Sequence, residues 1–367
     1  MKYLEKLAGI SVLSLVFAGF GINTAEMAKV PANAPEIQYF GRWNVQDEVY
    51  QTGQGATYIK ANFSGTSLKA DLTGEKIWWR VSIDGGEFRP FKAVGDDTVL
   101  AENLSEGEHS VLLVRSTEGE AGIGEFRGFT LEDGESLCQP SPMKTRRLEF
   151  VGDSITAGAM NLGAYDGNNY YDVQDGYMAY GPQLARKLDA DFSIVARSGE
   201  GIIHNYNEEW PPTGIHMGDR YGWAFCYKVR VDDPVLWDTA NYPVDAVIVS
   251  IGTNDFSGKQ KPKLVDFKAS YKKLLDIIRS QNPNKPIICI EPVPASVGAK
   301  VRKSIEQAVN EMLKDGYEKI YFIPLNEPSP LLKEEDFRND NTHPTVEGAA
   351  KLANYLEPIV ARLLGWK

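Results

Sequence analysis

The hydrophobic pattern of the chain changes character once, at the proline-rich stretch of residues 139–142. Before it, apolar and polar residues alternate in short runs separated by glycine-containing turns, which is typical of β-strands that bury one face. After it, continuous apolar runs alternate with longer segments in which Leu, Ile, Val and Ala recur at helical spacing. These are the patterns of two different layer architectures, so we expect an all-β domain followed by an α/β domain.

In the first domain the alternation is clearest at residues 57–63 and 78–83, and it returns at residues 110–114 and 126–131. Turn signals such as Asp84-Gly85-Gly86 separate these runs. Because no helical segment lies between them, the pattern predicts a β-sandwich of the jelly-roll type, with bounds at residues 35–140.

The second domain, over residues 145–367, contains five apolar runs, at residues 148–151, 192–196, 246–251, 287–290 and 320–324. Helical patterns occupy residues 177–188, 267–280, 300–314 and 346–364. Such alternation predicts a largely parallel sheet with helices on both faces and ligands at the carboxyl ends of its strands. Residues 201–242 interrupt the alternation with a long insert rich in aromatic side chains, which favours an ordered, functional loop.

The first segment, residues 1–25, differs from both domains. Lys2 and Lys6 precede a nearly uncharged apolar run at residues 7–22, which is the pattern of a secretory signal peptide with cleavage near Ala25. A retained membrane anchor or a buried helix is the alternative interpretation, although the run is short for a spanning helix. We expect a secreted or periplasmic protein with no integral membrane association after signal removal.

Charge and cysteine content exclude other classes of function. The formal net charge of −11 argues against nucleic-acid binding, which needs clustered Lys and Arg. Cys138, Cys226 and Cys289 lie far apart without metal-ligand spacing, so we expect no zinc site, and the odd count leaves at least one thiol unpaired. We expect a monomer without metal or cofactor.

Four loops of the second domain carry the groups that acyl transfer needs. Ser154 follows the first apolar run, Gly199 lies in a glycine-rich turn after the second, and Asn254 follows the third. His343 precedes the last helical segment, with Asp340 three residues earlier. A serine is a poor nucleophile without a base, an orienting group for that base and oxyanion donors. The prediction therefore depends on these loops meeting above the sheet.

The loops resemble, in order, the four consensus blocks of the GDSL, or SGNH, hydrolases: Gly152-Asp153-Ser154, Gly199, Gly252-Thr253-Asn254-Asp255 and Asp340-Asn341-Thr342-His343. Ile155 stands where leucine is usual. With the β domain in front and the aromatic insert, the chain is similar to the family-two carbohydrate esterases. These remove acetyl groups from plant polysaccharides and act best on acetyl at a primary sugar hydroxyl. The resemblance implies a three-layer, flavodoxin-like SGNH hydrolase domain and an acetylated carbohydrate as substrate.

The resemblance also implies a role for each residue. Ser154 is the expected nucleophile, His343 the general base and later the acid, and Asp340 the group that orients the imidazole. The expected oxyanion hole consists of the backbone N–H groups of Ser154 and Gly199 and the side-chain amide of Asn254. Some family-two esterases orient the histidine with a backbone carbonyl instead, so a Ser–His dyad stays open as an alternative.

Other functions remain alternatives at this point. The same groups serve lipid esters or acetylated sialic acids, although no amphipathic lid pattern favours a lipid. An alternative from another functional class is a carbohydrate-binding protein whose serine site is inactive. A nucleotide-binding domain is disfavoured because no G-x-G-x-x-G follows the first strand.

Several further residues have both a functional and a structural interpretation. Trp210 and Trp223 either stack on sugar rings or pack within the insert. The remaining interpretations place His204 and His216 on the surface or the rim of the site, His109 in solvent, and Glu208-Glu209 in a solvated pair.

Overall fold

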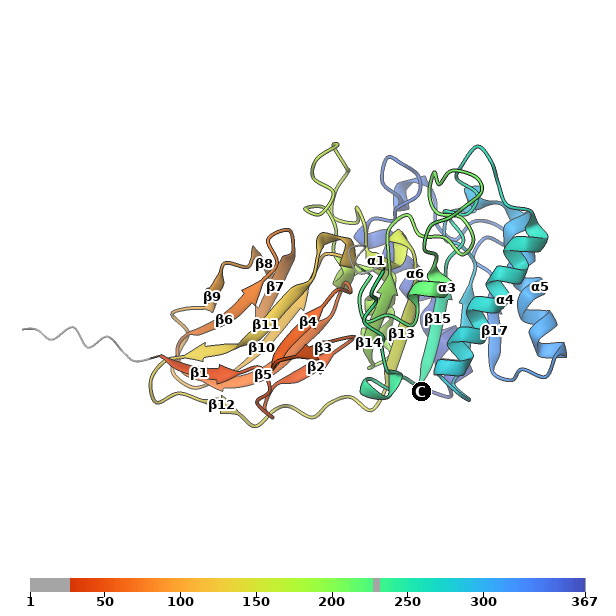
Figure 1. Ribbon diagram of the computed structural model, residues 1–367. Coiled ribbons are helices and arrows are strands. Elements are labelled where there is room, and N and C mark those ends of the chain that lie inside the picture. Colours follow the sequence, from red (N-terminus) through yellow and green to blue (C-terminus); the bar gives the residue numbers. More distant parts are fainter. Residues whose placement is uncertain (1–26, 227–231, 367) are drawn as a thin grey trace, which may run out of the picture.

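The computed structural model describes residues 27–226 and 232–366. The predicted signal peptide therefore lies outside the described residues. Figure 1 shows two parts side by side, an all-β part and an α/β part that contains the long helices. The all-β part contains the first twelve of the described strands. The predicted combination of a β-sandwich with a following α/β domain is confirmed.

The sandwich consists of two six-stranded sheets whose strand pairs are all antiparallel. One sheet contains β1 (Ala28–Pro31), β3 (Asn44–Gln46), β4 (Val49–Thr52), β6 (Leu68–Thr73), β9 (Gly95–Ala101) and β11 (Gly124–Leu131). The other contains β2 (Gln38–Phe40), β5 (Tyr58–Ser64), β7 (Trp78–Ile83), β8 (Arg89–Lys92), β10 (Glu108–Arg115) and β12 (Leu137–Cys138). Their inner faces meet around large apolar side chains, among them Phe63, Trp79 and Phe126.

The sheet of the second part is parallel, with the strand order β14-β13-β15-β16-β17. Its strands are β13 (Arg147–Gly152), β14 (Asp191–Ala196), β15 (Ala246–Ser250), β16 (Ile287–Ile290) and β17 (Ile320–Ile323). This is the 2-1-3-4-5 order of flavodoxin-like folds, in which the order of the strands reverses beside the first strand. Ligands bind at that switch point, outside the carboxyl ends of the strands. Here the point lies between β13 and β15.

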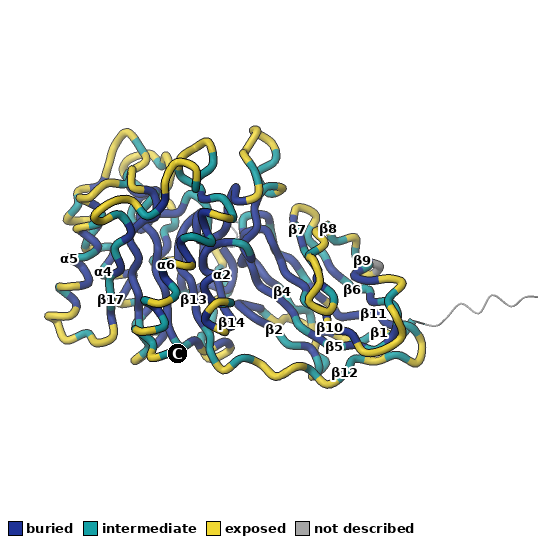
Figure 2. Tube along the Cα trace, turned by 180° about the vertical axis from the view of Figure 1, so that it is seen from behind, coloured by how far each residue is buried: buried dark blue, intermediate teal, exposed yellow. Residues whose placement is uncertain are grey.

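Helices cover both faces of this sheet (Figures 1 and 2). One face is covered by α2 (Tyr180–Lys187) and α6 (Val346–Leu364), which pack together, and the other by α4 (Leu264–Gln281) and α5 (Ala299–Lys314). The helix expected at residues 177–188 is instead a 3-10 turn, η2 (Gly176–Met178), followed by α2, because Ala179 adopts an extended conformation between them. Among the described helices, none is both long enough and apolar enough to cross a membrane.

Two short helices complete the α/β part. α1 (Ser154–Ala157) follows β13 directly, and α3 (Met217–Arg220) lies in the insert of residues 201–242. Besides η2, the 3-10 turns in the described part of the chain are η1 (Gly119–Ala121), η4 (Thr239–Asn241), η5 (Ala295–Val297) and η6 (Glu334–Asp336). Of these, η1 connects β10 and β11 of the sandwich.

Besides the core inside the sandwich, a second hydrophobic cluster contains residues of both parts. Phe40 and Tyr58 of the sandwich stack on each other, and the Tyr58 ring lies 4.9 Å from that of Phe192 on β14. All three belong to the buried cluster that also contains the parallel strands. Figure 2 shows buried chain both in β14 and in the neighbouring strands of the sandwich. Burial of this apolar surface is a principal force that holds the two parts together.

A buried arginine adds polar contacts to the same interface. Arg42, between β2 and β3, is fully buried, and its guanidinium donates to the Glu149 carboxylate at 3.1 Å. It also donates to the carbonyl oxygens of Tyr221 and Trp223, at 2.6 and 2.8 Å. The insert of residues 201–242 is therefore fixed against the sandwich as well as against the parallel sheet.

Candidate active site

Ser154 lies at the carboxyl end of β13, as the first residue of α1, and is nearly buried. The turn that places it there needs glycine at position 152. A Cβ on Gly152 would lie 2.1 Å from Oγ1 of Thr156 and 2.4 Å from the carbonyl oxygen of Ser250. The preceding Asp153 caps α1 by accepting the backbone N–H of Ile155 at 3.1 Å. The serine thus sits on a turn that its neighbours hold tightly.

His343 and Asp340 meet Ser154 from the loop before α6. The Nε2 atom of His343 lies 2.8 Å from Ser154 Oγ, although 189 positions separate the two residues in the chain. Its Nδ1 atom lies 2.5 Å from Oδ2 of Asp340, and Oδ1 of Asp340 accepts the N–H groups of Thr342 and His343. The structure therefore brings the three predicted residues into one hydrogen-bonded chain.

Two opposing effects set the charge of Asp340. Its partial burial alone would raise the pKa of the carboxyl, but the hydrogen bonds from the His343 ring and from the two backbone N–H groups outweigh burial and lower the pKa to about 2. The side chain is ionised at neutral pH. A carboxylate in this position favours the tautomer of His343 that carries its proton on Nδ1 and leaves Nε2 free to accept from serine.

Arg338 closes the histidine loop and ties it to the serine loop, a contact that the sequence analysis missed. Its backbone N–H donates to the His343 carbonyl at 2.8 Å. Its guanidinium donates to the carbonyl oxygens of Met160, at 3.0 Å, and Asn161, in the segment that follows α1. The two loops that carry the base and the hydroxyl are therefore joined directly.

The other two loops supply N–H donors. Gly199 follows β14 with φ at +75°, a left-handed conformation that favours glycine. Asn254 follows β15, and one N–H of its amide donates to the Glu200 carbonyl at 2.8 Å, which leaves its second N–H available. Within the described residues, the backbone N–H groups of Ser154 and Gly199 do not serve in the turn and loop hydrogen bonds. They are free for a ligand.

Asp255 fixes these two loops to each other. Its buried carboxylate accepts the consecutive backbone N–H groups of Ile202, Ile203 and His204 at distances of 2.8 to 3.2 Å. Burial raises the pKa of Asp255 to about 6, against the pull of these three hydrogen bonds. The turn that carries Gly199 is thus anchored to the loop that carries Asn254. Asp255 belongs to a motif block in the sequence, but the sequence analysis did not predict that it joins these two loops.

The two tryptophans of the insert lie in different environments. Trp223 is only 8% exposed, and the guanidinium of Arg220 lies 5.2 Å from its ring centre. Trp223 therefore packs within the insert. Its burial favours this interpretation over contact with substrate. Trp210 is 46% exposed, with its ring 6.3 Å from that of His204. Of the two, only Trp210 offers accessible aromatic surface.

Three interpretations of isolated polar residues are wrong. His204 is fully buried and bonds through Nε2 to the Glu208 carbonyl at 2.8 Å, so it is not a rim residue. Glu208 is not simply solvated: its carboxylate accepts N–H groups from residues 205, 213 and 214 and contacts His216, and these bonds outweigh desolvation and lower its pKa to about 2. His109 is buried between the Asp84 carboxylate and the Ser105 carbonyl rather than solvated. In each case the partner lies in a turn or loop whose hydrogen bonds the sequence pattern does not specify.

A pocket of about 220 Å³ opens beside the serine site. Asn254 and Thr342 belong to its lining, and Tyr206 contributes an aromatic side chain that is 60% exposed. The Tyr206 backbone N–H donates to the Gly199 carbonyl at 2.7 Å, so this side chain is held next to the donor loop. The sequence analysis did not single out Tyr206; its only sequence signal was its place in the aromatic insert.

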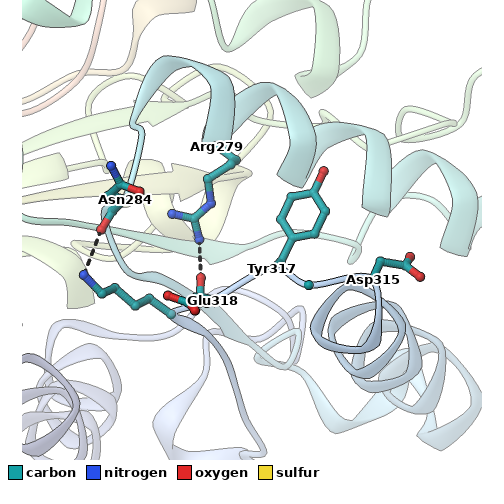
Figure 3. A pocket seen from close by; sticks show the side chains of 7 residues that line it. Arg279, Asn284, Asp315, Tyr317 and Glu318 are labelled. Atoms are coloured by element: carbon teal, nitrogen blue, oxygen red, sulfur yellow. Dashed lines mark hydrogen bonds between the residues drawn. The ribbon is translucent and has the colours of Figure 1, made fainter.

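A second pocket, of about 390 Å³, lies at the opposite end of the sheet (Figure 3). It is lined by Arg279, Asn284, Tyr317 and neighbouring residues, which precede the amino ends of β16 and β17. The guanidinium of Arg279 donates to the carbonyl oxygens of Lys285 and Glu318. Because Ser154 lies at the carboxyl ends of the strands, this pocket is separate from the serine site.

Comparison with known families matches both parts of the chain. The model described as carbohydrate esterase 2 N-terminal matches residues 39–142. The model described as GDSL-like lipase/acylhydrolase family matches residues 150–351, more than half of the chain.

Curated proteins give the same picture. The chain is 29% identical over 350 residues to the cellulase/esterase CelE of Acetivibrio thermocellus, a match that covers 93% of this chain and 41% of that protein. The chain thus spans less than half the length of that relative. It is 25% identical over 370 residues to an acetylxylan esterase / glucomannan deacetylase of Cellvibrio japonicus, and here the match covers 95% of this chain and 94% of the relative.

Solved structures share the fold along most of the chain. A family two carbohydrate esterase from Clostridium thermocellum, in complex with cellohexaose, superposes with a TM-score of 0.80 at 27% identity, over 90% of this chain and 100% of that one. A family two carbohydrate esterase from Cellvibrio japonicus has the same fold, with a TM-score of 0.82 at 21% identity, over 93% of this chain and 99% of that one. The chain therefore belongs to the GDSL-like lipase/acylhydrolase family and carries the N-terminal domain of the family-two carbohydrate esterases in front of its α/β domain.

Proposed function

We propose that this protein is a secreted serine esterase that removes acetyl groups from plant cell-wall polysaccharides or their oligosaccharides, such as xylan or glucomannan. The observation that carries the proposal is the hydrogen-bonded chain from Ser154 through His343 to Asp340, beside the free N–H donors of Gly199 and Asn254. Relatives named for acetylxylan esterase and glucomannan deacetylase activity support the choice of substrate.

In the first half-reaction, Ser154 Oγ attacks the carbonyl carbon of the acetyl ester while Nε2 of His343 takes the hydroxyl proton. The carbonyl oxygen becomes an oxyanion that accepts from the N–H groups of Ser154 and Gly199 and from the Asn254 amide. The bond between that carbon and the sugar oxygen then breaks. The imidazolium returns its proton to the sugar oxygen, which leaves as a free hydroxyl, and acetyl remains on the serine.

The second half-reaction repeats these steps with water. His343 Nε2 takes a proton from water, and the resulting hydroxide adds to the acetyl carbon. The bond to Ser154 Oγ breaks, the proton returns to the serine, and acetic acid leaves and ionises to acetate in solution. Asp340 stabilises the imidazolium in both halves without taking its proton. None of these steps uses a metal or cofactor, so we expect the activity to survive chelators.

The pocket next to the site supports a carbohydrate as the leaving group. Tyr206, whose side chain is exposed, and Thr342 line the same pocket as Asn254. An aromatic surface beside polar groups suits a sugar ring, which has apolar C–H faces and polar edges. We propose that Tyr206 contacts the sugar unit that carries the acetyl group, and that acetyl at a primary hydroxyl is the preferred target.

The decisive experiment measures acetate release from 4-nitrophenyl acetate and from acetylated xylan and glucomannan. Ser154→Ala should abolish release from all three. Ser280→Ala is the matched control because this hydroxyl lies on α4 and donates only to the Ile277 carbonyl. Wild-type turnover in Ser154→Ala would contradict the mechanism. Activity on the aryl ester but on neither polysaccharide would reject the substrate class and leave the mechanism standing.

Export, domain bounds and oligomeric state are part of the same proposal. We propose cleavage near residue 25, a sandwich domain of residues 35–140, a catalytic domain of residues 145–367, and a monomer. The amino-terminal sequence of the protein recovered from the medium or periplasm tests the cleavage. Its mass in solution tests the monomer, and retention of the uncleaved segment would contradict the predicted signal peptide.

A further inference from the structure

The loop that carries Gly199 is held from outside its own domain. Glu118, which directly precedes η1 of the sandwich, is fully buried, and its Oε2 atom accepts the backbone N–H of Ser198 at 2.7 Å. The preceding residue of the loop, Arg197, forms an ion pair with Glu120 in the same turn of the sandwich. Two consecutive residues of the donor loop thus contact two carboxylates of the sandwich, immediately before Gly199.

Glu118 is itself rigidly placed. Its backbone N–H donates to Oε1 of Gln174 at 2.8 Å, and its carbonyl accepts from Arg115 at 2.8 Å. Arg115 is fully buried and donates to three further carbonyl oxygens around the same turn, those of residues 52, 117 and 122. Because these hydrogen bonds hold the turn, its Glu118 carboxylate restrains the loop that it contacts.

Ser198 is restrained on its side chain as well. The hydroxyl of Tyr170 donates to Ser198 Oγ at 2.6 Å, from the segment between α1 and η2. The backbone N–H and the side chain of Ser198 are therefore both held, which limits the conformations open to this residue. These contacts restrain Ser198, and the peptide that carries the Gly199 N–H follows it directly.

The burial of Glu118 is costly. Moving a carboxylate out of water costs several kcal/mol unless its oxygens are paired. Within the described residues, Oε1 of Glu118 has no hydrogen-bond partner. Burial raises the pKa of Glu118, while Ser198 and Arg197 oppose the shift. A buried carboxylate that lacks a hydrogen-bond partner for one oxygen and lies next to a functional loop indicates a role beyond packing.

We propose that Glu118 is a positioning residue for the reaction: from the sandwich it fixes Ser198 and so aims the Gly199 N–H at the oxyanion. Glu118 touches no substrate, and the active site is assembled from both domains. This inference rests on the proposed esterase function. It makes the sandwich a working part of the catalytic unit rather than a neighbouring module.

The competing explanation is that Glu118 merely strengthens the domain interface, and β14 supplies a control for it. At the other end of this strand, Asp191 is also buried and bonds to the sandwich, with Tyr58 at 2.7 Å and Lys60 at 3.1 Å. Asp191 lies at the amino end of the sheet, away from Ser154. Its loss weakens the same interface without touching the donor loop.

The test compares Glu118→Ala, Glu118→Gln and Asp191→Ala in the full chain, by kcat and KM on 4-nitrophenyl acetate and by Tm. Losing an oxyanion donor costs about 10²–10³ in kcat, so we expect a misaimed donor in Glu118→Ala to cost about 10–100-fold with KM nearly unchanged. The amide oxygen of Glu118→Gln still accepts the Ser198 N–H, so this variant should recover most of kcat. Asp191→Ala should lower Tm and leave kcat within about twofold of wild type.

Wild-type kcat in Glu118→Ala, or an equal loss of kcat in Asp191→Ala, would overturn the inference. If Glu118→Ala does not fold, Tyr170→Phe is the second variant: it removes the other restraint on Ser198 and should lower kcat about 3–10-fold, on the same scale of donor losses. An unchanged kcat there would also overturn the inference. Wild-type turnover in Ser154→Ala would instead remove the proposed function and the inference with it.

Discussion

Asp340 and His343 are bonded twice, through the imidazole Nδ1 at 2.5 Å and through the backbone N–H of the histidine at 3.0 Å. The carboxylate therefore fixes the ring and the loop that carries it. This arrangement favours a Ser–His–Asp chain over a dyad held by a backbone carbonyl.

Asp340→Asn should lower kcat on 4-nitrophenyl acetate about 10²–10⁴-fold, because an amide that donates to Nδ1 stabilises the wrong tautomer of His343. Since the pKa of Asp340 is lowered to about 2, its carboxylate stays charged throughout the usual assay range and contributes no acidic limb above about pH 3. A loss of less than tenfold would favour the dyad. An Asp340-dependent limb near pH 4–5, absent in the variant, would contradict the assigned charge.

Tyr206→Ala should raise KM for acetylated oligosaccharides about 10-fold or more, because burying a large apolar side chain against the sugar contributes about 1.5–3 kcal/mol. KM for 4-nitrophenyl acetate, which lacks a sugar, should stay within about twofold. Trp210→Ala is the control, because Trp210 is exposed in the same insert but does not belong to the pocket lining. Equal effects on both substrates would show that Tyr206 acts by supporting the Gly199 loop instead.

Arg42→Met should destabilise the whole protein. Removing one partner of a buried ion pair costs about 3–5 kcal/mol, and at 2–4 °C per kcal/mol this corresponds to a fall in Tm of about 6–20 °C. Arg127→Met is the control, because Arg127 pairs with Glu125 and Asp71 at the surface and such pairs contribute about 0–1 kcal/mol. Because the two parts share a core, calorimetry should show a single transition. Two transitions, only one of them shifted, would contradict that core.

His109 should make the sandwich more stable at acidic than at alkaline pH. Its Nε2 faces the Ser105 carbonyl at 2.8 Å and its Nδ1 the Asp84 carboxylate at 2.6 Å; both acceptors favour the imidazolium and raise the pKa of His109. A raised folded-state pKa gives stability that is fully present below the unfolded value of about 6.5 and is lost as pH rises through the folded value.

The Tm of wild type should therefore exceed that of His109→Gln most clearly near pH 5.5, and the difference should shrink by pH 9. Asp84→Asn removes the carboxylate and should flatten this dependence. A difference in Tm that is constant with pH, or that grows on the alkaline side, would contradict a charged His109.

The sequence predicts this fold well where the pattern is continuous. The buried strands β13 to β17 are short and mostly apolar, and α4, α5 and α6 bury one face at helical spacing. The sandwich was recognised from its longer strands. Its edge strands β3 and β8 were missed because they are largely exposed and lack the alternation that burial imposes.

In the active site, too, some residues were predictable from the sequence and others were not. Its reacting residues were found because each follows or precedes a recognisable element and belongs to a motif block. Asp255, Glu118 and Arg338 were missed because their roles depend on backbone groups far along the chain: 80 positions separate Glu118 from Ser198. A single buried carboxylate leaves no periodic trace in a sequence, and the burial of His204 follows from a loop conformation that no local pattern specifies.

The shared core of Phe40, Tyr58 and Phe192 has a consequence for recombination. A crossover at the proline-rich joint would exchange one half of a packed surface without the other. Chimaeras between distant relatives should therefore fail at that joint unless the facing residues are moved together. For an engineer who wishes to change the substrate preference of this chain, the smallest transferable unit is the whole pair of domains.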